Sequence, residues 1–268
     1  MKISLVDSNC PELEPWLIGY LGGEIEGFDG MERRLLPARP NHFVQIILEG
    51  ALLIRDVQTG NSFPAPGAGL YGLLSHYRYD LEVAGTLRSV SARLQPAAAG
   101  VLFGFDPVAL VDNHFALEIP QGLLAKLKAA SSWEAMVQPL NGWLLGLAKG
   151  KRRDDPVARE ASRLRLRNGN VSIQQLADSA GLSLRHFQRR FRALTGINPK
   201  HYARICRIGH TIHMKELQPE TSWTALAHEA GYSDQPHFIR DFKALTGALP
   251  SGFLRGQSPI LRYPKWDE

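Results

Sequence analysis

The stretch Ile173-Gln-Gln-Leu-Ala-Asp-Ser-Ala-Gly181-Leu-Ser-Leu-Arg-His-Phe187-Gln-Arg-Arg-Phe191-Arg-Ala-Leu-Thr195-Gly196-Ile-Asn-Pro199 recurs in altered form as Trp223-Thr-Ala-Leu-Ala-His-Glu-Ala-Gly231-Tyr-Ser-Asp-Gln-Pro-His-Phe238-Ile-Arg-Asp-Phe242-Lys-Ala-Leu-Thr246-Gly247-Ala-Leu-Pro250. Leu-Ala-x-x-Ala-Gly recurs at an offset of 50 residues, and Phe-x-x-x-Phe and Ala-Leu-Thr-Gly recur at an offset of 51. Internal repeats of this kind decide the architecture of a chain. Two copies joined by one segment predict a tandem of similar units and not a solenoid.

Each copy has the features of two helices joined by a tight turn. A short apolar segment ends in Ala-Gly, and Gly181 and Gly231 provide the left-handed backbone that a turn of about three to four residues between helices needs. Ser183 can cap the helix that follows in the first copy, as Ser233 or Asp234 can in the second. The two phenylalanines of each second helix lie four residues apart, so both point toward a core. Each copy is therefore predicted to be a helix-turn-helix.

The opposite face of each second helix carries basic and amide side chains. Such side chains suit phosphates and base edges, because Arg pairs bidentately with guanine and Gln with adenine. The candidate DNA-binding residues are Arg185, Gln188, Arg189 and Arg192 in the first copy and Gln235, His237, Arg240 and Lys243 in the second. A lone arginine on a helix more often belongs to an ordinary solvated face. The same apolar and basic layout in both copies favours DNA contact.

The repeated pattern resembles the AraC/XylS family of transcription regulators over residues 157–253. Its most specific part is Ala-Gly-Tyr followed by Phe-x-Arg-x-Phe-Lys-x-x-x-Gly-x-x-Pro within residues 230–250. The resemblance implies a seven-helix domain whose two recognition helices enter successive major grooves on one face of DNA. The base-facing positions that it implies are Arg185, Gln188, Arg189, Gln235, His237 and Arg240.

The segment between the copies departs from the family pattern. The family usually has Arg-Leu-x-x-Ala-x-x-Leu-Leu there, whereas residues 207–215 are Arg-Ile-Gly-His-Thr-Ile-His-Met-Lys. A glycine inside a helix costs about 0.5–1 kcal/mol relative to alanine, so Gly209 predicts a softer joint between the copies. Asp241 lies beside the expected phosphate side, where a carboxylate would oppose contact with DNA.

Charge is divided between the two halves of this 268-residue chain. Residues 1–150 hold 11 Lys and Arg against 15 Asp and Glu, and residues 151–268 hold 20 against 11. A basic C-terminal half is the electrostatic footprint of a nucleic-acid domain. Cys10 and Cys206 are too few for a disulfide framework and fit a reducing cytoplasm. Without a signal-peptide pattern or a long apolar run, we expect a cytoplasmic protein of the bacterial nucleoid that has no membrane partner.

The N-terminal half changes to a strand pattern after a short lead-in. Trp16, Leu17 and Tyr20 lie at helical spacing and predict a helix within residues 1–20. The predicted strands are residues 43–48, 51–57, 69–74, 77–83 and 87–94. The first two are expected to pair as a hairpin around Glu49-Gly50. Short strands bounded by turns predict a small sandwich or barrel, which resembles the cupin-like sensing or partner domain of some AraC/XylS members.

Helices are predicted to follow the strands. They comprise residues 97–103, 107–111, 121–128 and 133–149. The last two carry wide apolar stripes, for which two interpretations stay open: packing onto the strands, or a helical dimer interface of the kind that the family places there. Residues 149–156, Lys-Gly-Lys-Arg-Arg-Asp-Asp-Pro, are charged and contain glycine and proline, a composition typical of a linker.

Nine histidines raise the question of a metal or catalytic site. His210 and His213 lie three residues apart on one predicted helix, but the sequence places no cysteine or carboxylate to complete a tetrahedral site. The N-terminal half lacks the His-x-His pair with a following glutamate of metal-dependent cupin enzymes. Neither a glycine-rich phosphate loop nor a Gly-x-Ser-x-Gly elbow occurs. We therefore expect no enzyme activity, no catalytic residue, no metal site and no cofactor.

These features predict an α+β protein with an N-terminal small β-barrel or cupin-like domain that carries helices and a C-terminal all-α tandem helix-turn-helix domain. The expected boundaries are residues 1–148 for a sensing or dimerisation domain, 149–156 for a linker, 157–257 for the DNA-binding domain and 258–268 for a tail. The expected function is sequence-specific transcription regulation, with activation as the expected sign although the residues do not distinguish it from repression.

Double-stranded DNA and RNA polymerase are the expected partners of such a regulator. A small-molecule effector and a second copy of the chain, forming a homodimer, are further candidates. Two alternatives stay open for the N-terminal half: a small-molecule enzyme that the DNA-binding half localises, or a protein-interaction module that has no pocket.

Overall fold

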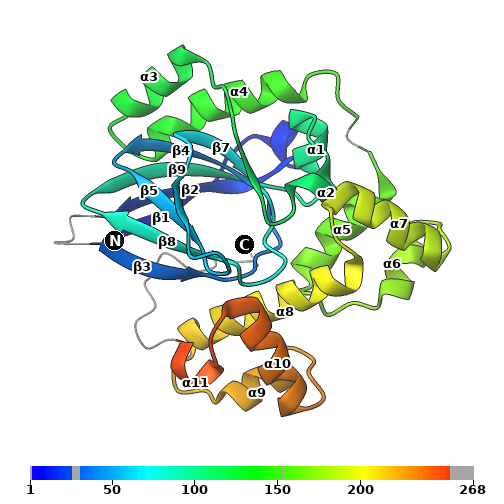
Figure 1. The fold of residues 1–268 in the computed structure, drawn as a ribbon. Coiled ribbons are helices and arrows are strands. Elements are labelled where there is room, and N and C mark those ends of the chain that lie inside the picture. The colour runs from blue at the N-terminus through cyan, green and yellow to red at the C-terminus, as the bar shows by residue number, and fades with distance from the viewer. Residues whose placement is uncertain (1, 26–30, 153, 254–268) are drawn as a thin grey trace.

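Two β-sheets and a layer of helices form the N-terminal half of the chain, whereas helices alone form the C-terminal half (Figure 1). The computed structural model describes residues 2–25, 31–152 and 154–253. The expected tail at residues 258–268 lies outside the described residues, as do residues 254–257 of the expected DNA-binding domain.

The strands form two antiparallel sheets that face each other. The six-stranded sheet has the order β1 (Lys2–Val6), β2 (Leu17–Ile25), β9 (Leu87–Leu94), β4 (Phe43–Glu49), β7 (Ala68–Tyr71) and β10 (His114–Ala116). The four-stranded sheet has the order β3 (Met31–Leu36), β8 (Tyr79–Ala84), β5 (Leu52–Asp56) and β6 (Ser62–Pro64). Buried Leu36 and Ile54 of the smaller sheet pack against Tyr71 of the larger one. The cupin-like half is thus an open sandwich, and no closed barrel forms among the described strands.

Helices cover the outer face of the six-stranded sheet (Figure 1). They are η1 (Pro11–Leu13), α1 (Ala98–Phe103), α2 (Pro107–Leu110), α3 (Gln121–Ala129), η2 (Glu134–Met136) and α4 (Val137–Ala148). Leu127 of α3 and Leu144 of α4 are buried in the same cluster as Val44 and Ile46 of β4. Packing onto the sheet therefore accounts for the buried part of both apolar stripes.

The expected hairpin between the first two predicted strands is wrong. Both strands form, as β4 and β5, but they lie in different sheets. Strand β4 pairs with β9 and β7, and β5 pairs with β8 and β6. The alternation of apolar side chains along a strand indicates which face is buried. It does not indicate the neighbouring strand, and here the turn at Gly50 carries the chain from one sheet to the other.

The expected helix within residues 1–20 is also wrong, because this segment forms β1, η1 and the start of β2. Leu17 and Tyr20 are buried at 5% and 2% exposure, although residues three apart on a regular strand face opposite sides. A register shift between Leu17 and Gly19, opposite β9, inserts one extra residue. Such a bulge returns Leu17 and Tyr20 to the same face, and that spacing is the one that a helix also produces.

The described part of the C-terminal half, residues 154–253, consists of the seven helices that the resemblance implied. They are α5 (Pro156–Leu166), α6 (Ile173–Ser179), α7 (Leu184–Thr195), α8 (Pro199–Leu217), α9 (Trp223–Glu229), α10 (Gln235–Thr246) and α11 (Pro250–Phe253). Helices α6 and α7 form the first helix-turn-helix, and α9 and α10 form the second. Both predicted turn glycines are left-handed, at φ +67° for Gly181 and +83° for Gly231. The long helix α8 continues unbroken through Gly209, so no kink forms at the joint.

The repeated motifs have matching structural roles in the two copies. The Ser183 hydroxyl caps α7 by accepting from the His186 N–H at 3.4 Å, and Asp234 rather than Ser233 caps α10, through the His237 N–H at 2.7 Å. The four predicted phenylalanines are buried at 1% exposure or less. The repeated Thr-Gly ends each second helix. The fully buried threonine hydroxyl donates to the carbonyl four residues earlier, and the glycine that follows is left-handed.

His42 is a fully buried titratable group between β3 and β4. Its Nδ1 accepts a hydrogen bond of 3.1 Å from the Leu73 backbone N–H, so Nδ1 is the unprotonated nitrogen. Burial lowers the pKa of His42 to about 4, against a smaller opposite effect of the Thr195 carbonyl. In the folded protein, the His42 imidazole is therefore neutral at neutral pH.

We predict that acidification below pH 6.5 destabilises the protein through His42. The unfolded chain binds the proton near pH 6.5 and the folded chain only near pH 4, so the free energy of unfolding falls by about 3 kcal/mol across this window. Chemical denaturation at several pH values measures it. His42→Asn keeps an acceptor for Leu73 and is expected to flatten that pH dependence. An equally steep dependence in the variant would assign the effect to other groups.

Candidate nucleic-acid interface

The outer face of α7 carries the first set of candidate DNA-binding residues. Arg185, Arg189 and Arg192 are exposed, and Gln188 is half-buried. Residues three and four apart on a helix share a face, so these side chains form one basic stripe. The two phenylalanines of α7 lie on the opposite face and are fully buried. The core packing of α7 thus turns its basic stripe outward.

The second set lies on α10 with a similar layout. Gln235, Arg240 and Lys243 are exposed. The side chain of His237 is 43% exposed, and its Nε2 lies 3.4 Å from a carboxylate oxygen of Asp241. His237 therefore has an intramolecular partner that the other three candidates on this helix do not share.

Asp241 points into the protein and not toward the side expected to face DNA phosphates. Its carboxylate accepts two hydrogen bonds from Arg204 of α8, at 2.5 and 3.0 Å, and one of 3.2 Å from the Tyr232 hydroxyl. Burial by itself would raise the pKa of Asp241, but the hydrogen bonds and positive charge of Arg204, together with His237 and the Tyr232 hydroxyl, lower the pKa overall. Asp241 is a buried ion-pair partner that fastens α10 to α8, so the expected conflict with DNA phosphates does not arise.

The C-terminal end of α10 contacts the N-terminal half. The Leu245 carbonyl accepts a hydrogen bond of 2.7 Å from the Ala38 N–H, and the Ala244 carbonyl accepts one of 3.1 Å from the Tyr77 N–H. Gly247 ends the helix at φ +79°, and a methyl group added there would lie 2.3 Å from the Tyr77 ring. A glycine thus allows both the helix ending and the close approach.

The C-terminal end of α7 meets the same half at another place. Its final glycine, Gly196, is left-handed at φ +90°, and a methyl group there would lie 2.4 Å from the Pro107 carbonyl oxygen of α2. Gly196 and Gly247 are equivalent positions of the repeat. Each helix has 12 residues and is about 18 Å long. The starts of the two helices, which bear Arg185 and Gln235, lie at the ends opposite the docked glycines.

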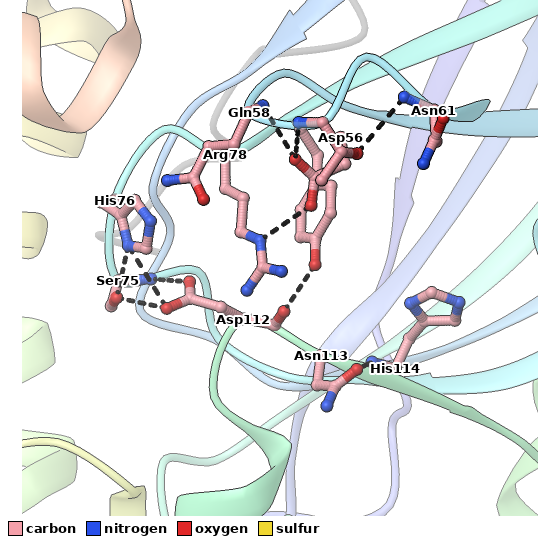
Figure 2. A network of polar contacts seen from close by, with 11 residues as sticks. Asp56, Gln58, Asn61, Ser75, His76, Arg78, Asp112, Asn113 and His114 are labelled. Atoms are coloured by element: carbon pink, nitrogen blue, oxygen red, sulfur yellow. Dashed lines mark hydrogen bonds and ion pairs between the residues drawn. The ribbon is translucent and has the colours of Figure 1, made fainter. Parts of the chain in front are cut away.

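A polar network holds the loop that contacts α10, which we call the contact loop (residues 75–78). Figure 2 shows Asp112 accepting from both the backbone N–H and the hydroxyl of Ser75, at 2.6 and 2.5 Å. Arg78, at the other end of the loop, donates to Asp56 at 3.2 Å. Both ends of the loop are therefore fixed to the sandwich.

The contact loop also binds α8. Nε2 of His201 lies 2.7 Å from the Ser75 carbonyl oxygen, a distance at which a neutral histidine donates its proton. Burial lowers the pKa of His201, against the opposite effect of this carbonyl. The partners are 126 residues apart in sequence. No local sequence pattern indicates such a pair, and the contact loop was not predicted.

Two further features limit the chemistry of the described residues. They contain no group of three or more His, Cys, Asp and Glu side chains arranged to hold a metal ion. In the same residues, none of the helices has the length and apolar character required to cross a membrane.

We predict that Gly247→Ala releases the contact loop from α10. A side chain at a left-handed residue costs about 1–2 kcal/mol, and at Gly247 it would also displace the Tyr77 ring. Hydrogen exchange of the Tyr77 amide, which donates to Ala244, is expected to lose protection. Gly181→Ala is the matched control, since φ is +67° there and nothing lies within 4 Å of the added methyl. Equal loss of Tyr77 protection in both variants would contradict the prediction.

The C-terminal half is similar to known helix-turn-helix proteins. Residues 176–256 match the family described as a helix-turn-helix domain. The chain is 26% identical over 214 residues to the transcriptional activator RhaS of Escherichia fergusonii, and 29% identical over 92 residues to that of Escherichia coli. The alignments cover 73% and 34% of this chain, and 66% and 33% of those relatives. Less than two thirds of either relative is therefore matched.

Solved structures extend the likeness to the whole fold. A structure of ToxT from Vibrio cholerae superposes with a TM-score of 0.53, covering 88% of this chain and 97% of ToxT at 12% sequence identity. A second ToxT structure, with an unsaturated fatty acid bound, superposes with a TM-score of 0.50 at the same identity. The C-terminal half therefore contains a helix-turn-helix domain of the matched family, and the chain as a whole has a fold similar to that of ToxT.

Proposed function

We propose that this protein is a sequence-specific DNA-binding transcription regulator in which α7 and α10 read successive major grooves. The carrying observation is the duplicated arrangement of two recognition helices with buried phenylalanine faces, exposed basic faces and C-terminal ends docked on the N-terminal half. The C-terminal ends of α7 and α10 contact the N-terminal half. Their exposed starts are left for DNA.

Helix α8 supports two-groove recognition by its length. Its 19 residues are about 28 Å long, and half-sites on one face of DNA repeat about every 34–36 Å. The eight proposed DNA-binding residues are Arg185, Gln188, Arg189, Arg192, Gln235, His237, Arg240 and Lys243. Of these, His237 also contacts Asp241 within the protein through its Nε2.

The proposed division of labour follows the two halves, with residues 1–148 as a sensing or dimerisation domain, 149–156 as a linker and 157–257 for DNA binding. The fatty acid in a ToxT structure supports a small-molecule effector here too. A cavity of about 90 Å³ lies between the sheets and is lined mainly by apolar side chains, with Gln45, Ser89 and Ser91 as polar members. Ligand sites usually have about 300–1,000 Å³, so an effector would have to open this cavity.

The proposed sign of regulation, the partner protein and the cellular location follow from a role in transcription. The curated relatives are named as transcriptional activators, which supports activation through contact with RNA polymerase. We assign the protein to the cytoplasm, on the nucleoid, with no catalytic step of its own. A homodimer would use either the part of the α3 and α4 stripes that the sheet leaves partly exposed or another surface.

Selection of random DNA duplexes by the purified protein tests this function. Two conserved blocks about 10–10.5 base pairs apart are expected, one for each recognition helix. A single block would leave one of the two helices as an anchor without sequence preference. Salt-sensitive binding without any enriched sequence would reject sequence-specific regulation.

Arg240→Ala tests the assignment of one side chain within the selected site. Loss of a bidentate base contact is expected to cost about 1–3 kcal/mol of binding free energy and to relax specificity at one base position. Binding to the selected site and to single-base variants of it measures both effects. Arg159→Ala, an exposed arginine of α5, is the control. Uniform weakening on every sequence would mean that Arg240 contacts a phosphate.

A further inference from the structure

A polar hollow of about 450 Å³ opens on the surface of the C-terminal half, between the end of α5 and the middle of α8. Its eight lining residues are Arg163, Arg167, Gly169, Asn170, Val171, Ser172, Gln175 and Arg207, and none of them carries a carboxylate. Three guanidinium groups around one open hollow form a site for an anion. None of the three belongs to the exposed faces of α7 and α10 described above.

The hollow lies where the two helix-turn-helix copies meet. Ser172 and Gln175 belong to the start of α6 in the first copy. The second copy reaches the hollow through Tyr232, in the turn that leads into α10: its ring centre lies 5.2 Å from the guanidinium group of Arg207 of α8. A methyl group added at the neighbouring Gly231 would lie 3.3 Å from Asn170 Oδ1. The hollow therefore joins the α5–α6 loop of one copy to the turn of the other.

The three arginines differ in their partners. Arg163 donates to Glu160 and to the Ser179 hydroxyl, both at 3.2 Å, so an acidic group already offsets part of its charge. Arg207 packs on Tyr232, and its Nε is buried without a hydrogen-bond partner among the described residues. Arg167 is exposed at the end of α5. The positive charge offered to a ligand therefore comes mainly from Arg167 and Arg207.

We propose that this hollow binds a phosphate of the DNA backbone between the two major grooves. The proposal rests on the proposed function, because two helices in successive grooves leave one stretch of sugar-phosphate backbone passing beneath the junction of the copies. Guanidinium groups match the geometry of phosphate oxygens and can bind them bidentately. This contact carries no base information, and it fixes the register of both recognition helices on the duplex.

Arg167→Gln tests the proposal, since Arg167 is exposed and its loss leaves the core intact. Each phosphate contact contributes about 0.9 to the slope of log affinity against log salt. The variant is expected to lower that slope by about 0.9, so that the loss of affinity between 50 and 200 mM salt becomes about 3.5-fold smaller than in the parent. At one salt concentration, the variant is expected to lose as much affinity for the selected duplex as for a duplex of unrelated sequence. Arg159→Gln, on the same helix but outside the hollow, is expected to keep the parent slope.

Two results would overturn the proposal. One is a slope of log affinity against log salt that is unchanged from the parent protein in Arg167→Gln. Arg207→Gln, if folded, is the second variant, and an unchanged slope there would count equally. The other is stabilisation of the DNA-free protein by inorganic phosphate that Arg167→Gln abolishes while the slope for DNA is unchanged, which would assign the hollow to a free anion. Both results leave sequence-specific binding by α7 and α10 standing. Loss of all sequence preference in the parent protein would instead reject the proposed function.

Discussion

The close approach of both recognition helices to the N-terminal half is the constraint on which the arrangement of this protein depends. Gly196 and Gly247 end α7 and α10 in a left-handed conformation, and both press on backbone or aromatic atoms of that half. A side chain at either position would meet both the backbone penalty and a steric overlap. The repeat thus uses one residue type for two tasks, ending a helix and docking it. Docking at the C-termini leaves the N-termini for a partner.

A second constraint lies between the helices themselves. The ion pair between Asp241 and Arg204 fastens α10 to α8, and the buried phenylalanines fasten each recognition helix to its own copy. Loss of Arg204 would leave the buried carboxylate of Asp241 without its cationic partner, which is costly. The second recognition helix is therefore positioned by α8 on one side and by the contact loop on its end.

The contact loop connects the sandwich to both helices. Ser75 is held by Asp112 on the sandwich side and meets His201 of α8 through its carbonyl, while Tyr77 meets the end of α10. The contact loop therefore touches the sandwich, α8 and the C-terminal end of α10 at the same time. The cavity between the sheets is lined in part by Leu81 and Val83 of β8, the strand that follows the contact loop in the chain.

The sequence by itself determined the tandem helix-turn-helix, because each copy depends on local signals: an apolar period, a turn glycine, a capping residue and a Thr-Gly ending. It also predicted that the basic residues of α7 and α10 face outward, since the phenylalanine spacing settles which face is buried. Tertiary structure alone decided the rest. The sheet partners of β4 and β5, the bulge that made Leu17 and Tyr20 resemble a helix, and the inward turn of Asp241 all depend on residues far away in the chain. Contacts such as that of His201 with Ser75 join residues more than a hundred positions apart, and no local pattern encodes a partner at that distance.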